Sequence, residues 1–216
     1  MTQFEVQQTD DGSLTIYDKL HNETFHSVYG ARNESLYVFI EQGLKKFCNQ
    51  PSLTILEVGL GTGLNAYLTF FNKAQNQTIY YEAIELYPLT SELVQIIASS
   101  LENQTIYLQL MQAPWNKEQP INKDFVVYKR NEDILNIKFS KVFDLIYFDA
   151  FSPKAQPELW TLDVFQNLFQ HLNSGGALVT YASSGIVKQN LRSVGFKVER
   201  LQGPPHKHHM VRVWKI

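Results

Sequence analysis

The sequence predicts an α/β fold built on a mostly parallel sheet, and three observations support it. Apolar, β-branched runs alternate with amphipathic stretches along most of the chain, which is typical of strands joined by crossover helices. The first run of this series leads into a turn with glycine at every second position, from Gly59 to Gly63. The last two runs, 196–201 and 209–214, lie too close together for a crossover helix and therefore predict an antiparallel hairpin.

The spacing of apolar residues gives the elements in order. At the N-terminus, segments 4–7 and 14–17 flank an Asp-Asp-Gly turn and predict a small β-hairpin. A helix over 34–47 with one apolar face follows. The further strands expected are 53–58, 78–85, 125–129, 143–148, 176–181, 196–201 and 209–214, and the further helices are 62–74, 88–100, 157–171 and 184–194. Residues 101–123 are polar and irregular, and we expect helix and loop there. The prediction is one domain, in which residues 1–50 form an extension packed on a core of residues 51–216.

The glycine turn predicts a cofactor site. Glycine permits positive φ and lets a ligand approach the backbone without meeting a Cβ atom. The turn follows the strand 53–58, at the strand end where open α/β sheets bind ligands. A dinucleotide-binding turn would place its third small residue at position 64, where this chain has Leu64. The acidic Glu57 beside the turn suits a ligand with cationic groups and would repel a pyrophosphate. A tight turn without a ligand and a nicotinamide or flavin site are the alternatives.

Further acidic residues follow successive strands. Glu85 lies at a carboxyl end about 20 residues beyond the glycines, where a carboxylate can accept hydrogen bonds from ribose hydroxyls. Asp133 follows strand 125–129. Asp149 directly follows strand 143–148, and we expect it next to the glycine turn. A carboxylate at the position of Asp149 can hold an amine by a charge-assisted hydrogen bond and accept its proton. The alternative for each acid is a solvated loop residue or a turn cap.

Composition narrows the classes of protein. The chain has 216 residues and 44% apolar content, enough for the core of one domain. It has no apolar run of the length that spans a bilayer, and residues 1–11 are polar and acidic rather than signal-like. The single cysteine, Cys48, excludes an internal disulfide and fits a reducing compartment, and we expect it to be a small core residue on a helix. These features predict a cytoplasmic protein without membrane contact.

Positive charge is concentrated near the C-terminus. The chain carries a formal net charge of −2, yet seven of the eight charged residues from Lys188 to Ile216 are basic. Such a segment on an acidic body predicts a face that contacts phosphates, and a chance cluster of surface charges is the equal alternative. His206, His208 and His209 add to this face. They have no cysteine or carboxylate at ligand spacing, so we expect no metal site.

Several segments together resemble one enzyme family. They are Phe25-His26-Ser27 with Gly30-Ala31 and Glu34-Ser35, the glycine turn, the string from Asp149 to Trp160, Gly175-Gly176, and Val194-Gly195-Phe196. This pattern resembles the class I S-adenosylmethionine-dependent methyltransferases that complete 5-methylaminomethyl-2-thiouridine at the wobble position of tRNA. The resemblance implies a Rossmann-like fold and N-methylation of the aminomethyl group of 5-aminomethyl-2-thiouridine in the anticodon loop. In many bacteria this domain is fused to a flavin-dependent oxidase, and the chain looks like the stand-alone form.

The resemblance and the charge pattern define a set of candidate site residues. Asp149 is the candidate catalytic residue that holds the attacking amine. The candidate contacts to S-adenosylmethionine are Glu57, Gly59, Gly61, Gly63, Glu85, Asp133 and Asp149. The candidate contacts to tRNA are His26, Ser27, Glu34, Ser35, Phe151 and Trp160, with Lys188, Arg192, Lys207 and Arg212 from the basic segment. Two other classes of function remain open, namely an aminopropyltransferase such as spermidine synthase and a non-catalytic RNA-binding module.

Overall fold

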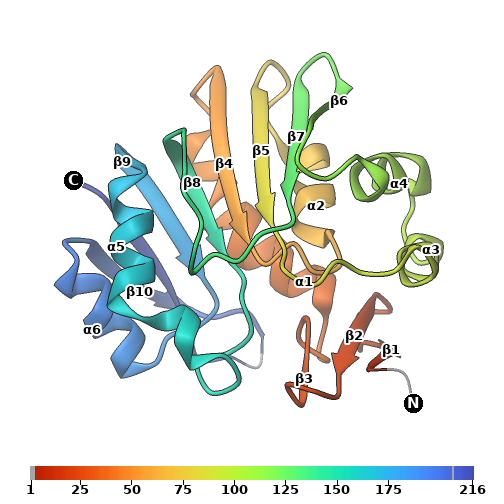
Figure 1. Ribbon diagram of the computed structural model, residues 1–216, viewed down its shortest axis with the longest axis horizontal. Coiled ribbons are helices and arrows are strands. Elements are labelled where there is room, and N and C mark those ends of the chain that lie inside the picture. Colours follow the sequence, from red (N-terminus) through yellow and green to blue (C-terminus); the bar gives the residue numbers. More distant parts are fainter. Residues whose placement is uncertain (1–2, 206) are drawn as a thin grey trace.

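The computed structural model describes residues 3–205 and 207–216, and an eight-stranded sheet forms the centre of this part of the chain (Figure 1). The strands lie in the order β10-β11-β9-β8-β4-β5-β7-β6. Their bounds are β4 (Ser52–Val58), β5 (Thr78–Ile84), β6 (Glu118–Asn122), β7 (Phe125–Arg130), β8 (Phe143–Phe148), β9 (Leu172–Thr180), β10 (Lys197–Gln202) and β11 (His209–Trp214).

The pairing confirms a mostly parallel sheet that ends in a hairpin. Strands β9, β8, β4, β5 and β7 pair in parallel, and β11 is antiparallel to both β9 and β10. At the opposite edge, β6 pairs antiparallel with β7. The sequence prediction missed β6 because its residues are largely polar and include Pro120, features that suit an edge strand and resemble a loop.

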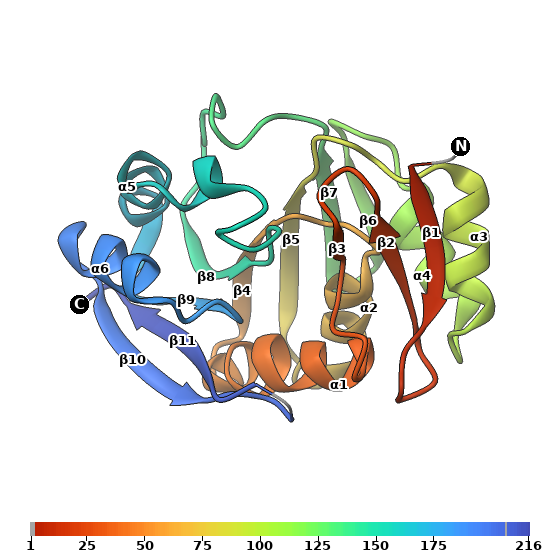
Figure 2. The same cartoon turned by 90° about the horizontal axis from the view of Figure 1, so that it is seen from below.

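Helices cover both faces of the sheet (Figures 1 and 2). The central strand β4 is buried on both sides: Ile55 belongs to one apolar cluster and Leu56 to the other. This double burial explains the continuous apolar run in its sequence. The first cluster includes residues of α1 (Ala31–Ser35), the π-helical segment η1 (Leu36–Glu41), the 3-10 segment η2 (Leu44–Phe47), α2 (Leu64–Asn72), α3 (Ser91–Ser99) and α4 (Gln104–Gln112). The second includes residues of the 3-10 segment η3 (Pro157–Trp160), α5 (Leu162–Gln170) and α6 (Gly185–Ser193).

Two predicted helices are divided in the structure. The helix expected over 34–47 begins earlier, at Ala31, and continues as η1 and η2. The helix expected over 157–171 is interrupted at Thr161, whose extended backbone separates η3 from α5. The prediction that Cys48 is a helical core residue was wrong: Cys48 is exposed in the turn that follows η2.

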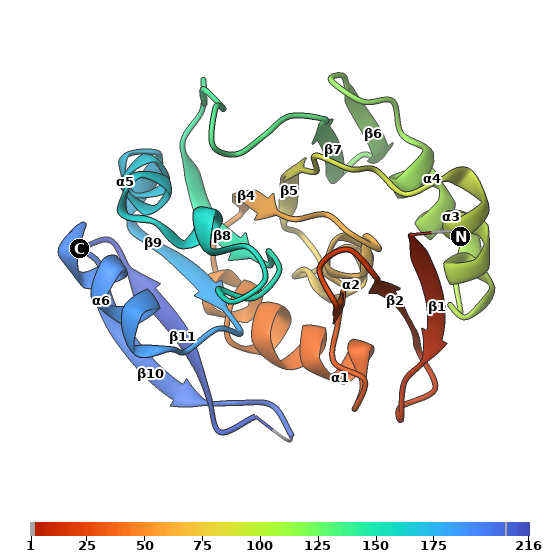
Figure 3. The same cartoon turned by 60° about the horizontal axis from the view of Figure 1, so that its bottom comes forward.

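The N-terminal residues form a second, three-stranded antiparallel sheet. It contains the predicted hairpin, β1 (Phe4–Gln8) with β2 (Leu14–Asp18), and adds the short β3 (Glu23–Thr24). This sheet lies beyond the carboxyl ends of the parallel strands (Figures 2 and 3). There the Glu23 carboxylate accepts hydrogen bonds from the backbone N–H of Ser152, at 3.0 Å, and from its hydroxyl. Within the described residues, no helix combines the length and the apolar character that crossing a membrane requires.

Candidate functional site

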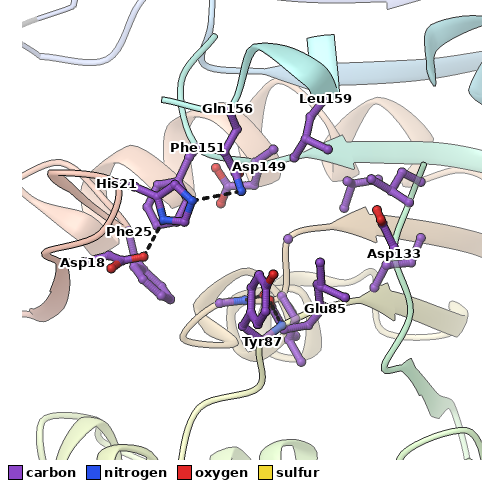
Figure 4. A pocket seen from close by; sticks show the side chains of 18 of the residues that line it. Asp18, His21, Phe25, Glu85, Tyr87, Asp133, Asp149, Phe151, Gln156 and Leu159 are labelled. Atoms are coloured by element: carbon purple, nitrogen blue, oxygen red, sulfur yellow. Dashed lines mark hydrogen bonds and ion pairs between the residues drawn. The ribbon is translucent and has the colours of Figure 1, made fainter. Parts of the chain in front are cut away.

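A cavity of about 360 Å³ lies between the N-terminal sheet and the carboxyl ends of the parallel strands (Figure 4). The turn after β4 contributes Gly59 and Gly61, and the loops after β5, β7 and β8 contribute Glu85, Asp133 and Asp149. These residues converge because the carboxyl ends of parallel strands meet at one edge of a sheet. The structure therefore brings five of the predicted cofactor contacts around one cavity.

The glycine turn closes tightly against its neighbours. Gly59 and Gly61 have φ values of +88° and +50°, in the left-handed region that favours glycine. A Cβ atom on Gly59 would lie 2.7 Å from the backbone oxygen of Asp149. Gly63 lies away from the cavity lining, where a Cβ atom would come within 2.2 Å of the sulfur of Met111. Gly63 thus allows α2 and α4 to pack, while Gly59 and Gly61 shape the cavity.

Asp149 stands at the end of β8 with its carboxylate directed into the cavity (Figure 4). Its backbone N–H donates to the carbonyl oxygen of Val58 at 2.9 Å, which fixes the strand end beside the glycine turn. Its carboxylate accepts a hydrogen bond of 2.8 Å from the side-chain amide of Asn65. Burial, assisted by the nearby Glu34 carboxylate, raises the pKa of Asp149 from 3.8 to about 7. The group is therefore near its titration point at neutral pH, which suits a residue that takes up a proton.

Glu57 lies behind the glycine turn and does not line the cavity. Its side chain is fully buried and accepts a 2.9 Å hydrogen bond from the amide of Asn65. Burial raises the pKa of Glu57 well above its ordinary value, and the adjacent Asp149 carboxylate adds to this effect. Burial therefore favours the protonated form of Glu57, and the residue supports the turn through Asn65 from behind the cavity lining.

The other two predicted acids line the cavity and are held by backbone groups. The Glu85 carboxylate accepts hydrogen bonds from the N–H groups of Gly61, at 3.0 Å, and Tyr87, at 2.9 Å. Burial raises the pKa of Glu85 in spite of these bonds. The Asp133 carboxylate accepts a 2.9 Å hydrogen bond from the backbone N–H of Leu135 and so caps its own turn. Both side chains are oriented before any ligand arrives.

The N-terminal candidates form a buried polar group next to this cavity. His26 lines the cavity, and its Nε2 lies 2.8 Å from the Thr62 hydroxyl. Burial lowers the pKa of His26 to about 4, so the imidazole is neutral at pH 7. Glu34 accepts the backbone N–H of Ser27 at 2.8 Å and forms an ion pair with Lys207. The fold thus joins two candidates from opposite ends of the chain.

The remaining candidates occupy different positions. Phe151 lines the cavity and stacks on the ring of His21 at a centroid distance of 4.8 Å. Trp160 is only 3% exposed and donates to the carbonyl oxygen of Phe151 at 2.9 Å, so it supports that turn from within the core. Ser35 is fully buried at the end of α1. Lys188 and Arg192 lie on α6, outside the cavity lining, where Arg192 is exposed.

Arg212 also lies outside the cavity. Its guanidinium pairs with Glu199 at 2.9 Å and donates to the carbonyl oxygen of Gln42 at 3.2 Å. It therefore connects β11 to β10 and to the end of η1. Of the predicted histidine group, His206 lies outside the described residues. Over residues 3–205 and 207–216, no group of three or more His, Cys, Asp or Glu side chains is arranged to hold a metal ion.

Two cavity-lining residues, one at the end of β2 and one in the turn that follows it, were not predicted. His21 and Asp18 are joined by a 2.6 Å contact between Nδ1 and Oδ2, and Gln156 lies 3.4 Å from the other ring nitrogen. No periodicity or motif marks this pair in the sequence. Its position depends on how the N-terminal sheet folds over the strand ends, which only the tertiary structure shows.

The cavity is acidic. Its lining holds Asp18, Glu85, Glu132, Asp133, Asp149 and Glu158, whereas none of the described lining residues is Lys or Arg. This environment suits a ligand with cationic groups and disfavours a pyrophosphate, which normally binds to donors and positive charge. S-adenosylmethionine carries an ammonium group and a sulfonium, and the close glycine turn leaves room for it. The residues present therefore fit this cofactor.

Comparisons with known proteins agree with this geometry. Residues 91–216 match a family described as S-adenosyl-L-methionine-dependent methyltransferase. The chain is 27% identical over 203 residues to the tRNA 5-methylaminomethyl-2-thiouridine biosynthesis bifunctional protein MnmC of Cupriavidus necator, covering 87% of this chain and 31% of the relative. The MnmC protein of Actinobacillus pleuropneumoniae is 26% identical over 217 residues, covering 88% of this chain and 32% of the relative. The chain thus spans about a third of the length of the curated relatives it matches.

Solved structures give the same result. The crystal structure of MNMC2 from Aquifex aeolicus superposes with a TM-score of 0.78 at 26% identity, covering 99% of this chain and 71% of the other. Spermidine synthase from Thermotoga maritima superposes with a TM-score of 0.61 at 12% identity, covering 98% of this chain and 68% of the other, which shows a shared fold alone. The acidic, glycine-lined cavity, the sheet order and these matches lead to one conclusion: the chain belongs to the S-adenosyl-L-methionine-dependent methyltransferase family and is related to MnmC.

Proposed function

We propose that this enzyme methylates the aminomethyl group of 5-aminomethyl-2-thiouridine at the wobble position of tRNA. The observation that carries the proposal is Asp149, a carboxylate with a pKa of about 7 at a strand end in an acidic cavity. The names of the MnmC relatives support the substrate. We further propose that the protein acts in the cytoplasm, where its tRNA substrate is found.

S-adenosylmethionine supplies a methyl carbon bonded to a positively charged sulfur. We expect the cofactor to contact Gly59, Gly61, Glu85 and Asp133, with Glu57 and Gly63 supporting the turn from behind. In its ionised form, Asp149 would attract the substrate ammonium, hold it by a charge-assisted hydrogen bond and accept its proton. The free amine is then a nucleophile. Most of the acceleration would come from the alignment of two partners in one cavity.

The tRNA would approach from the N-terminal sheet and the basic C-terminal segment. A wobble base lies in a single-stranded loop and can turn outward into a pocket without breaking a duplex. The cavity walls nearest the N-terminal sheet offer Phe151 as a stacking surface and His26 as a neutral polar group. Since the cavity lining is acidic, the phosphates would bind outside it, with Lys188 and Arg192 as the first candidates.

The proposal is tested by nucleoside mass spectrometry. The purified protein and S-adenosylmethionine are incubated with tRNA from a strain that lacks this methyltransferase and accumulates the unmethylated aminomethyl nucleoside. We expect loss of that nucleoside and appearance of its methylated form. A matched reaction contains decarboxylated S-adenosylmethionine and a polyamine, and it tests for aminopropyl transfer. The proposal would be rejected if the tRNA stays unmethylated while an aminopropyl group is transferred from the decarboxylated analogue to the polyamine.

A further inference from the structure

Asn65, the second residue of α2, joins two acidic residues of the site through one side chain. Its amide nitrogen donates to Oε1 of Glu57 at 2.9 Å and to Oδ2 of Asp149 at 2.8 Å. Glu57 belongs to β4, and Asp149 directly follows the neighbouring strand β8. Asn65 is 2% exposed, so water does not replace either bond. The proposed function of the site assigns no role to this residue.

The chemistry of the contacts fixes the orientation of the amide. Both neighbours on this side are carboxyl oxygens that accept hydrogen bonds, and only the NH₂ group of an asparagine carries two donors. The flanking Leu64 and Ala66 are also buried, which fixes the helix turn that carries Asn65. In the part of the chain that the structure describes, Asn65 provides the hydrogen bond donated to the Asp149 side chain.

We propose that Asn65 is a positioning residue that holds the Asp149 carboxylate toward the cavity and favours its ionised form. The inference rests on the proposed function only in giving Asp149 a part in methyl transfer. A donor aimed at a carboxylate stabilises the charged state over the protonated one. Asn65 thereby opposes the burial that favours protonation of Asp149.

Other titratable groups lie near Asp149 and also affect the balance between its ionised and protonated forms. They are Glu57 of β4, Tyr81 of β5, Glu34 of α1, Tyr181 after β9 and Lys207 before β11. Among them, only Lys207 is positively charged, and it is already paired with Glu34. The Glu34 carboxylate disfavours a second negative charge on Asp149. A neutral donor such as Asn65 supports ionisation without adding a permanent cation that would repel a substrate ammonium.

The test is an NMR titration of the ligand-free protein that carries ¹³C-carboxyl aspartate, with the signal of Asp149 assigned by its loss in Asp149→Asn. The variants are Asn65→Ala, which removes both donors, and Asn65→Ser, which retains one hydroxyl donor. The control is Asn72→Ala on the same helix, whose amide donates to the carbonyl oxygen of Leu68 at 2.8 Å, outside the cavity lining. We expect the titration midpoint of Asp149 to rise by about one pH unit in Asn65→Ala. The rise should be smaller in Asn65→Ser, and the control should not change.

The acid limb of the pH profile for methyl transfer should move upward with the NMR midpoint. An unchanged Asp149 midpoint in folded Asn65→Ala overturns the proposal. If circular dichroism shows that this variant does not fold, an unchanged midpoint in Asn65→Ser overturns it instead. The titration needs neither tRNA nor cofactor. A raised midpoint in a protein that fails to methylate the aminomethyl nucleoside would therefore support the role of Asn65 and reject the proposed substrate.

Discussion

The raised pKa of Asp149 predicts that Asp149→Asn stabilises the protein at alkaline pH while it removes methyl transfer. The carboxyl has an ordinary pKa of 3.8 and a folded-state pKa of about 7. Between these values the folded protein binds more protons than the unfolded chain, so the free energy of unfolding falls as the pH rises. Above pH 7 this loss is complete. An asparagine, which does not ionise, avoids it.

The magnitude follows from the two pKa values. At about 1.36 kcal/mol for each pKa unit, the difference corresponds to about 4 kcal/mol. The side chain is only partly buried and opens to the cavity, and solvent screening reduces this figure, so we expect about 2 kcal/mol. The new side chain keeps an oxygen that accepts the hydrogen bond from Asn65, so packing is conserved.

The assay is urea unfolding of the parent and Asp149→Asn at pH 4 and at pH 8. We expect nearly equal free energies of unfolding at pH 4 and a more stable variant at pH 8. Methyl transfer by the variant should fall by about 10²-fold or more, because the acceptor for the amine proton is lost. An identical stability difference at both pH values would refute the raised pKa. Turnover within a few-fold of the parent would show that Asp149 does not hold the amine.

Three further predictions concern the turn, the buried histidine and the basic segment. Gly61→Val should abolish S-adenosylmethionine binding in calorimetry, because φ of Gly61 is +50° and a Cβ atom would lie 3.0 Å from the Phe25 ring. Retained affinity in a folded variant would contradict the assignment of the cofactor site to this turn. His26, with a pKa of about 4 against an ordinary 6.5, binds fewer protons when folded, so its contribution to the stability of the parent should fall by about 3 kcal/mol as the pH falls between these values. The difference in free energy of unfolding between the parent and His26→Gln, measured by denaturant titration at pH 4 and pH 7, should change by this amount, and a difference that does not depend on pH would exclude the lowered pKa. Replacing Lys188 and Arg192 by Ala should reduce the slope of log affinity for tRNA against log salt by about 0.7 to 0.9 for each lost phosphate contact, and an unchanged slope means that tRNA docks elsewhere.

The strand ends of the site were predictable from the sequence. Apolar runs that stop at an acid or a glycine mark where a buried strand leaves the core, because a charge inside such a strand is costly. This reasoning correctly placed Gly61, Glu85, Asp133 and Asp149 around one cavity. It was less successful for irregular segments. The edge strand β6 and the exposed Cys48 were missed because their surroundings, rather than their own residue types, decide their conformation.

The parallel sheet, its terminal hairpin and the acids at its carboxyl edge follow from the order of residues alone, since these features depend on local periodicity and on strand ends that must coincide. Which polar groups meet depends on the packed fold. It placed Glu57 behind the turn, joined Glu34 to Lys207, and set the amide of Asn65 between two acids. Such contacts join residues that are distant in sequence, and their geometry depends on how helices and sheets pack. Packing also sets the burial of Asp149, and burial is what raises its pKa into the range that proton transfer requires.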